Sequence, residues 1–176
     1  MVFLKRAVAL ILFICLVFSL SSCNGEQEIA KQFVIPMRFC ASTSGGNSKY
    51  FVDITSDKSI FGFDEANALH GAEICFMQEE CIFSAGEYSY KVEKERFPAM
   101  KTLDFAVRTL AKGETEGVKT ENGVKYTIDE TIILVYYDKD TEAVIGIRTE
   151  EFGRVFEFTL SDLEPYEAQS NGAGQS

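Results

Sequence analysis

The sequence contains no tryptophan, only three prolines and a single histidine, His70. One histidine leaves few ways to build a zinc centre or a Ser–His–Asp arrangement, and His70 precedes Gly71 in a predicted loop. The chain also has no Gly-x-Ser-x-Gly segment, no phosphate-binding glycine loop and no dinucleotide fingerprint. The sequence therefore predicts a non-enzymatic protein with no catalytic residues, no metal site and no cofactor.

Closely spaced carboxylates are the remaining candidates for chemistry. Asp138–Glu142 carries three carboxylates at alternate positions, as calcium loops do, but it lacks the central glycine and the distant glutamate of an EF-hand. The pairs Glu79-Glu80 and Glu150-Glu151 are the residue types that glycosidases use as acids. All three segments lie at predicted turns of an acidic chain, so we interpret them as solvated turns. A hydrolase is kept as an alternative, which an enclosed cleft with two convergent carboxylates would support.

Long hydrophobic runs are scarce as well: the sequence has one, Ala7–Leu20. The basic start Met1–Arg6 precedes this run, and Ser21 and Ser22 follow it, which is the pattern of a secretory signal. A membrane-spanning helix is the alternative, but it needs roughly 20 apolar residues and this run is shorter. We therefore predict that residues 1–22 are a signal peptide.

The segment Leu20-Ser21-Ser22-Cys23 resembles the bacterial lipobox, in which a hydrophobic residue and two small residues precede a cysteine. The resemblance implies acylation of Cys23 and removal of the preceding residues; an ordinary signal followed by a chance cysteine is the alternative. Two or three acyl chains on one residue anchor a protein stably. The expected location is a cell membrane, with the domain facing outward. Asn24 does not resemble the aspartate that retains lipoproteins at the inner membrane, so the outer membrane is open in a producer with two membranes.

Positive charge is in short supply. The chain has 17 basic and 27 acidic residues. Removal of the predicted signal peptide takes away Lys5 and Arg6, which leaves 15 basic residues and a formal charge of −12. Such a surface repels nucleic acid and anionic lipid headgroups. We therefore expect no nucleic-acid partner, and contact with the membrane only through the lipid on Cys23.

The cysteines do not form an obvious framework. With Cys15 in the signal segment and Cys23 lipidated, three thiols are left, Cys40, Cys75 and Cys81, and three is odd for a set of disulfides. Cys75 and Cys81 could form a disulfide if their hairpin were centred on Gln78. Their spacing is poor for a zinc site.

The rest of the chain is organised as one domain. Residues 23–32 are polar and predict a lipidated tether, residues 33–167 predict a single β-rich domain, and residues 168–176 predict a disordered tail. Alternation of apolar and polar residues with a period of two dominates the domain and predicts strands. The expected strands are 33–42, 50–55, 72–77, 81–84, 88–92, 116–121, 124–129, 131–137, 144–149 and 154–160.

One helix is predicted over Pro98–Lys112, because Met100, Leu103, Val107 and Leu110 recur at spacings of three and four. Pro98 suits a first helical position, and a glycine follows the last. The strand after the helix turns at Asn122-Gly123, a strong hairpin signal. We expect an α+β, mostly-β fold: a curved antiparallel sheet, or half-barrel, with one main helix packed on it.

This element order is similar to that of the lipoprotein-carrier (LolA/LppX-like) half-barrel superfamily. The likeness is strongest in the closing stretch, where Val135–Asp140 leads to Ile145–Ile147 and then to Val155–Pro165. Members of that superfamily bind acyl chains between a curved sheet and its covering helices. The resemblance therefore implies a carrier of apolar ligands, although one helix is few for a large lipid cavity.

Aromatic residues are plentiful, with 15 Phe and 7 Tyr. They can be the core, or some of them can line an apolar groove where the helix leaves the sheet uncovered. The candidate ligand-binding residues are Phe61, Phe63, Phe76, Phe83, Tyr88, Tyr136, Phe156 and Phe158. We expect the domain to bind an apolar ligand, a lipid or a lipidated partner, between sheet and helix. The alternative is a protein–protein interaction module of the cell envelope with no small ligand.

Overall fold

The computed structural model describes residues 29–44 and 49–166. Its first wing of strands is β1 (Met37–Thr43), β2 (Lys49–Ile54), β3 (Lys58–Phe63), β4 (Ala72–Met77), β5 (Cys81–Ala85) and β6 (Tyr88–Val92). A short 3-10 turn, η1 (Lys94–Arg96), leads into the helix α3 (Pro98–Lys112). The second wing is β7 (Val118–Lys119), β8 (Val124–Ile128), β9 (Thr131–Tyr137), β10 (Val144–Glu151) and β11 (Arg154–Pro165).

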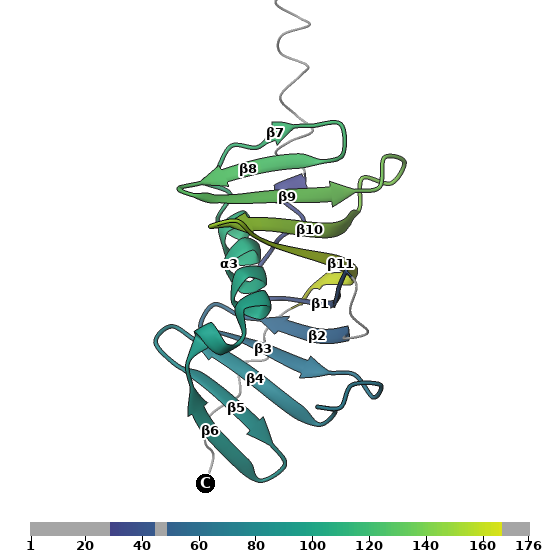
Figure 1. Ribbon diagram of the computed structural model, residues 1–176. Helices are drawn as coiled ribbons and strands as arrows, with labels where there is room; N and C mark the ends of the chain where they lie inside the picture. Colours follow the sequence, from purple (N-terminus) through teal and green to yellow (C-terminus); the bar gives the residue numbers. More distant parts are fainter. Residues whose placement is uncertain (1–28, 45–48, 167–176) are drawn as a thin grey trace, which may run out of the picture.

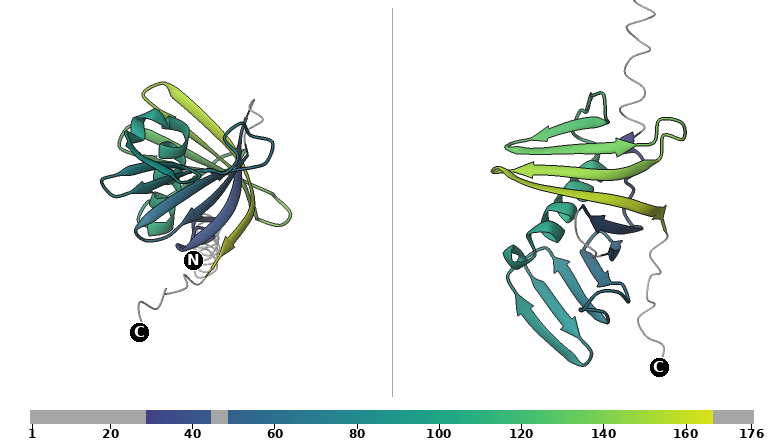
Figure 2. Two further views of the ribbon diagram at one scale, coloured as in Figure 1. Left: turned by 90° about the horizontal axis from the view of Figure 1, so that it is seen from below. Right: turned by 45° about the vertical axis from the view of Figure 1, so that its right-hand side comes forward.

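All eleven strands form one antiparallel sheet, in the order β6-β5-β4-β3-β2-β1-β11-β10-β9-β8-β7 (Figure 1). Each wing is a meander of hairpins, and the two wings join in the middle because the last strand pairs with the first. Ala41 of β1 lies opposite Leu160 of β11 at this junction. The sheet curves, with α3 on its inner side (Figure 2). The prediction of a mostly-β fold, with an antiparallel sheet and one main helix, is confirmed.

The bounds of α3 agree with the sequence pattern. Pro98 occupies the first turn, and Gly113 ends the helix in the left-handed conformation at φ 65° while its N–H bonds to the carbonyl of Leu110. The strand β3 is an element that the sequence pattern did not predict. A hairpin forms near the predicted position, but Lys119 pairs with Val124 and the Thr120 N–H bonds to the Gly123 carbonyl, so its two-residue turn is Glu121-Asn122 and not the predicted Asn122-Gly123. β7 keeps only two residues of the expected strand 116–121.

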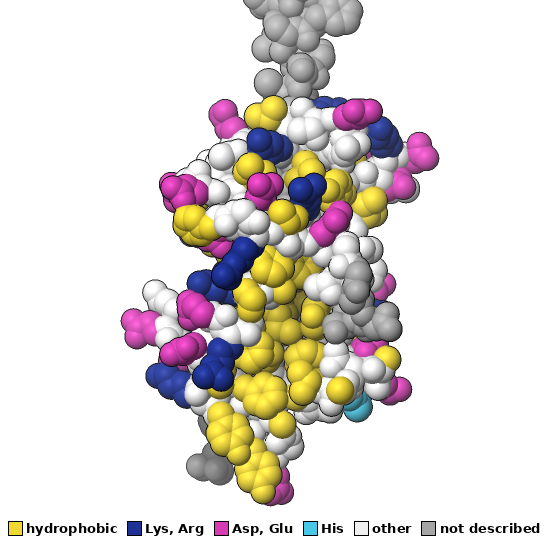
Figure 3. All heavy atoms as spheres, viewed as in Figure 1, with side chains coloured by type: hydrophobic (Ala, Val, Ile, Leu, Met, Phe, Trp, Pro, Cys, Tyr) yellow, Lys and Arg dark blue, Asp and Glu magenta, His cyan; other side chains and the backbone are white. Residues whose placement is uncertain are grey.

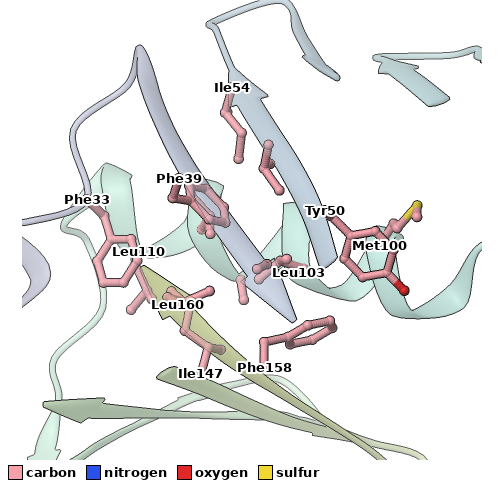
Figure 4. Close-up of a cluster of buried hydrophobic side chains, with 14 of the residues drawn as sticks. Phe33, Phe39, Tyr50, Ile54, Met100, Leu103, Leu110, Ile147, Phe158 and Leu160 are labelled. Carbon is pink, nitrogen blue, oxygen red and sulfur yellow. The ribbon is translucent and has the colours of Figure 1, made fainter. Parts of the chain in front are cut away.

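The core lies between α3 and the inner face of the sheet. Leu103, Ala106 and Val107 of the helix are fully buried, as are Ile133 of β9 and Ile147 of β10. Figure 4 shows side chains from both wings and from α3 converging in this space. Burial of apolar surface here is the main stabilising contribution to the fold, at about 25 cal/mol per Å².

A buried polar cluster fixes α3 to the first wing. The Ser59 hydroxyl of β3 donates to the Asp104 carboxylate, and Arg108 donates from Nη2 to Ser59 Oγ at 2.7 Å and from Nη1 to the Thr55 carbonyl at 2.9 Å. Arg108 Nε also pairs with Asp104 Oδ1 at 2.8 Å. Because every member has a partner, this cluster sets the position of the helix at low desolvation cost.

The packed part of the chain starts before the predicted boundary at Phe33. Ile29 is buried, and Gln32 donates from its side chain to the Glu142 carbonyl at 2.7 Å and accepts from the Val144 N–H at 3.0 Å. The predicted signal segment 1–22, Cys23 and the predicted tail 168–176 lie outside the described residues. Among the residues that the structure describes, no helix is long and apolar enough to cross a membrane.

Candidate ligand-binding face

The inner face of the first wing carries a row of aligned apolar side chains. The antiparallel register places one residue from each of the six strands side by side. The row runs from β1 to β6 as Phe39, Val52, Phe61, Ile74, Phe83 and Tyr90. A continuous apolar wall therefore crosses this half of the sheet.

The helix covers only one end of that wall. Its polar contacts with the first wing go to Thr55 and Ser59, at the β2–β3 turn, and η1 is tied through Lys94 to the carbonyls of Met77 and Gln78. The opposite ends of the same strands therefore lie beside α3 instead of beneath it.

The exposed fraction of the inner-face side chains rises from β3 toward β6. Phe61 and Ile74 are fully buried, Phe83 is half-buried, and on the last strand Tyr90 and Tyr88 are 56% and 67% exposed. We call the inner-face residues at these strand ends the inner strip. Tyr50 and Phe63 are its buried part, Phe83 and Ala85 are half-buried, and Tyr88 and Tyr90 are exposed. Figure 3 shows hydrophobic side chains forming an unbroken band down this face of the first wing.

Charged groups of the same strands point to the other side of the sheet. On this outer face Arg38 pairs with Asp53 at 2.9 Å and stacks its guanidinium over the Tyr166 ring at 4.2 Å, while Lys91 pairs with Glu80 at 2.5 Å. Burial and the hydrogen bond to Asp53 raise the pKa of Tyr166. The inner strip carries aromatic rings, the methyl group of Ala85 and three tyrosine hydroxyls, two of them near its edge on Tyr88 and Tyr90, and it has no charged group, which suits an apolar ligand.

The eight predicted ligand-binding residues fall into different environments. Phe61, Phe63, Phe76 and Phe158 are buried and belong wholly or mainly to the core. Phe63 also lies at the buried part of the inner strip, and Phe83 and Tyr88 lie on that strip as well. Phe156 is half-buried on the inner face of the second wing and packs against the core. The structure therefore brings only part of the predicted set together.

Tyr136 is on the wrong side for an inner-face site. It lies opposite Gly146, and a Cβ added to that glycine would be 3.3 Å from the Tyr136 ring. Its neighbour Val135 is the residue that points inward, where it is fully buried. The prediction that Tyr136 lines an inner groove is therefore wrong.

Three strip residues, Tyr50, Ala85 and Tyr90, were missed by the sequence analysis as ligand contacts. Tyr50 and Ala85 become part of the strip only through pairing with Phe63 and Tyr88, respectively. The alternation of Tyr88 and Tyr90 within β6 was the one local signal for this end of the strip. Tyr90 could have been found from that signal, whereas Tyr50 and Ala85 required the cross-strand register.

The conditional disulfide is not formed. Cys75 lies opposite Ile82, and Cys81 lies opposite Phe76, so the two thiols are on opposite faces of the hairpin and both are free. The expected register centred on Gln78 is wrong because the hairpin pairs one residue further along. Burial raises the pKa of Cys40, Cys75 and Cys81, which keeps these thiols protonated and weakly nucleophilic at neutral pH.

The Asp138 loop is a hydrogen-bonded turn. Asp138 Oδ1 accepts from the N–H groups of Asp140 and Thr141 at 3.0 and 2.8 Å, and from the Thr141 hydroxyl at 2.9 Å. The carboxylate oxygen that a cation would need is thereby engaged within the loop. Across residues 29–44 and 49–166, no group of three or more His, Cys, Asp or Glu side chains could hold a metal ion.

Several cavities lie away from the inner strip. One of about 640 Å³ is at the end of α3, between Phe33, Leu110 and Tyr126. Shallower hollows of about 420 and 360 Å³ lie on the outer faces of the first and second wings. Core side chains fill the space directly under the middle of α3, which leaves no room there for the ligand that was predicted between sheet and helix.

Comparisons with known proteins give a fold neighbour only. No family model matches the sequence, and no curated protein matches it. One similar solved structure is a LolA superfamily protein from Nitrosomonas europaea, with 11% sequence identity and a TM-score of 0.43 over 83% of this chain and 94% of that chain. A likeness of this size bears on neither ligand nor partner.

Proposed function

We propose that this chain is a non-enzymatic, extracytoplasmic lipoprotein that binds an apolar ligand along the inner strip. The ligand class is the acyl chain of a lipid or of a lipidated partner. The observation that carries the proposal is the uncharged inner strip of the first wing, which continues the buried core to the exposed rings of Tyr88 and Tyr90 (Figure 3). The lipobox-like segment before Cys23 supports attachment to a membrane.

The dimensions of the strip suit an acyl chain. Five strands spaced at about 4.8 Å give roughly 19 Å from β2 to β6, whereas one leaflet of a bilayer core is about 15 Å thick. The chain would lie across the strands, with the sheet below it and α3 along one side. Each methylene that leaves water contributes about 0.8 kcal/mol, and Tyr88 and Tyr90 place hydroxyl groups where a polar end would emerge.

A second candidate is an interaction module that binds another envelope protein without a small ligand. The observation in its favour is the exposure of Tyr88 and Tyr90 on β6, a strand at the end of the sheet. Exposed aromatic side chains beside a free strand edge are features of peptide-binding sheets.

Native mass spectrometry with lipid extraction separates the two candidates. The chain from Glu26 onward, expressed without its signal, is purified without detergent and then offered fatty acids and phospholipids. The lipid proposal predicts adducts of defined mass that organic extraction removes. An unchanged protein mass at every lipid concentration would contradict it and would leave the protein-binding candidate.

A further inference from the structure

Strand β6 leaves one edge of the sheet open. Among the described residues, only β5 pairs with it. The connection is a two-residue turn in which Gly86 has φ 58°, and the flanking pair is Ala85 and Tyr88. That flanking pair shares its backbone hydrogen bonds. The bonding direction alternates along a strand, so the N–H and C=O groups of Ser89 and Lys91 point to the open edge.

This edge lacks several of the usual protections against pairing. Natural end strands are protected by proline, bulges, inward-pointing charges, short length or exposed lysine. β6 has the sequence Tyr-Ser-Tyr-Lys-Val, contains no proline, and pairs with β5 without a bulge. Its single charge, on Lys91, points to the outer face. The inner face of the same strand carries Tyr88 and Tyr90, which are mostly exposed.

We propose that a second copy of this chain pairs with this edge, β6 against β6, antiparallel about a two-fold axis at Ser89. In this register Ser89 of one copy lies opposite Ser89 of the other, and their N–H and C=O groups bond reciprocally. Tyr88 lies opposite Tyr90 of the other copy, twice, on the inner face. Glu87, in the turn directly before the strand, comes close to Lys91 of the other copy, twice.

Charge selects this register and this occupant. Moving the axis by one residue, to Tyr90, would bring Glu87 close to Glu93 of the other copy, each just beyond an end of β6, and like charges facing each other across paired strands are destabilising. In the register about Ser89, one short strand and the turn before it supply both aromatic partners and opposite charges. This self-complementarity favours a second copy over an unrelated strand. The pairing also joins the inner strips of the two copies into one apolar face, and it does not depend on a bound lipid.

Cross-linking of the full chain in the producing cell's envelope tests the pairing directly. Opposed residues in a hydrogen-bonded pair have Cα atoms about 5.5 Å apart, which a disulfide can span. With a mild oxidant, Ser89→Cys is expected to give a disulfide-linked dimer. Ser84→Cys is the matched control. Ser84 lies opposite Ser89 on the neighbouring strand β5, with the two hydroxyl oxygens 2.9 Å apart, but it is one strand further from the open edge. Two copies of residue 84 would be roughly 14 Å apart.

Charge exchange in the Ser89→Cys background provides the second measurement. Glu87→Lys or Lys91→Glu alone should lower the cross-linked yield about tenfold at low expression, since two pairs per dimer become like-charged. The double exchange should restore the yield. Because Lys91→Glu removes the ion pair with Glu80 in both the single and the double variant, such a recovery cannot come from that pair. Equal yields for Ser89→Cys and Ser84→Cys, or no recovery in the double exchange, would overturn the proposal. Linkage of Ser89→Cys to a different protein alone would do the same.

Discussion

Tyr90 lies directly opposite Phe83 across the β5–β6 ladder, and both rings are on the inner side of the sheet. Phe83 is half-buried by its neighbours, whereas Tyr90 is 56% exposed. The pair therefore extends the packed apolar core into an open surface without a change of face. This continuity is why the inner strip, and not an enclosed chamber, is our candidate for ligand binding.

Substitutions on the strip should weaken lipid binding and leave the fold intact. We expect Tyr90→Ser to raise the dissociation constant for a fatty acid by about tenfold, because the ligand loses roughly 1.5 kcal/mol of apolar contact. The free energy of unfolding should change by less than about 0.5 kcal/mol, since the side chain is exposed. Phe51→Ser is the matched control: Phe51 is 51% exposed but lies on the outer face. Equal losses in both variants would argue against a site on the inner face.

The core under α3 should be far more sensitive than the opposite side of the same helix. Leu103→Ala removes a fully buried side chain, and we expect a loss of about 3 kcal/mol in the free energy of unfolding. Phe105 is 42% exposed on the same helix, so Phe105→Ala should cost less than about 1 kcal/mol. Urea unfolding followed by circular dichroism measures both. A smaller loss for Leu103→Ala than for Phe105→Ala would be inconsistent with the packing described.

The polar cluster between α3 and β3 should contribute to the free energy of unfolding, because removing one member leaves the others without a hydrogen-bond partner. Arg108→Ala leaves Asp104, Ser59 and the Thr55 carbonyl without their shared donor, and the expected destabilisation is about 2 kcal/mol. Lys101→Ala removes only the exposed pair with Glu95, for which less than about 0.5 kcal/mol is expected. Thermal unfolding of the two variants at one pH compares these values, and similar shifts would show that the cluster is dispensable.

The β9–β10 loop should lose stability in acid. Hydrogen bonds from the backbone and side chain of Thr141, and then from the backbone of Asp140, lower the pKa of Asp138. Because the pKa in the folded state is below that of the unfolded chain, the carboxylate stabilises the fold above about pH 4, and this contribution is lost as the pH falls through the folded value. Asp138→Ala should therefore be less stable than the parent at pH 7, with a difference that shrinks below about pH 4. Urea titrations across this range test it; a difference independent of pH would contradict the assignment.

The tip of the β10–β11 hairpin should be easy to stabilise. Phe152 and Gly153 both have positive φ, at 47° and 74°, and Phe152 is 78% exposed. Asparagine adopts this conformation with less strain, and Asn-Gly is the preferred pair in such turns. We expect Phe152→Asn to raise the free energy of unfolding by about 0.5–1 kcal/mol, measured by denaturant unfolding. Destabilisation would mean that the ring makes contacts that outweigh the strain.

Most strands and the helix could be predicted because their apolar residues repeat with a clear period. The strand β3 could not, since one of its three buried inner positions is the polar Ser59 while the outer position Ile60 is apolar. Ser59 is tolerated there only because Asp104 and Arg108, 45 and 49 residues further along the chain, supply its hydrogen bonds. Pairing between the first and last strands is equally non-local, so the joining of the two wings was out of reach of periodicity.

The sequence predicted that the candidate site would be apolar and aromatic, but it identified only some of the residues that form it. In β9 both faces carry apolar residues, so alternation alone cannot tell whether Tyr136 or Val135 points inward. A bulge between Val144 and Gly146 further shifts the register of the neighbouring strand. The position of α3 decides which aromatic residues are covered, and that position depends on contacts between distant segments.

The most direct test of a ligand site on the inner strip is photo-labelling with a fatty acid that carries a diazirine on its acyl chain. Peptide mass spectrometry would then locate the labelled residues. Our proposal predicts labels in the segments that contain Phe83, Tyr88 and Tyr90, competed by unlabelled fatty acid, and none at Phe51 on the outer face. Labels spread over both faces of the sheet, or confined to the cavity at the end of α3, would contradict it.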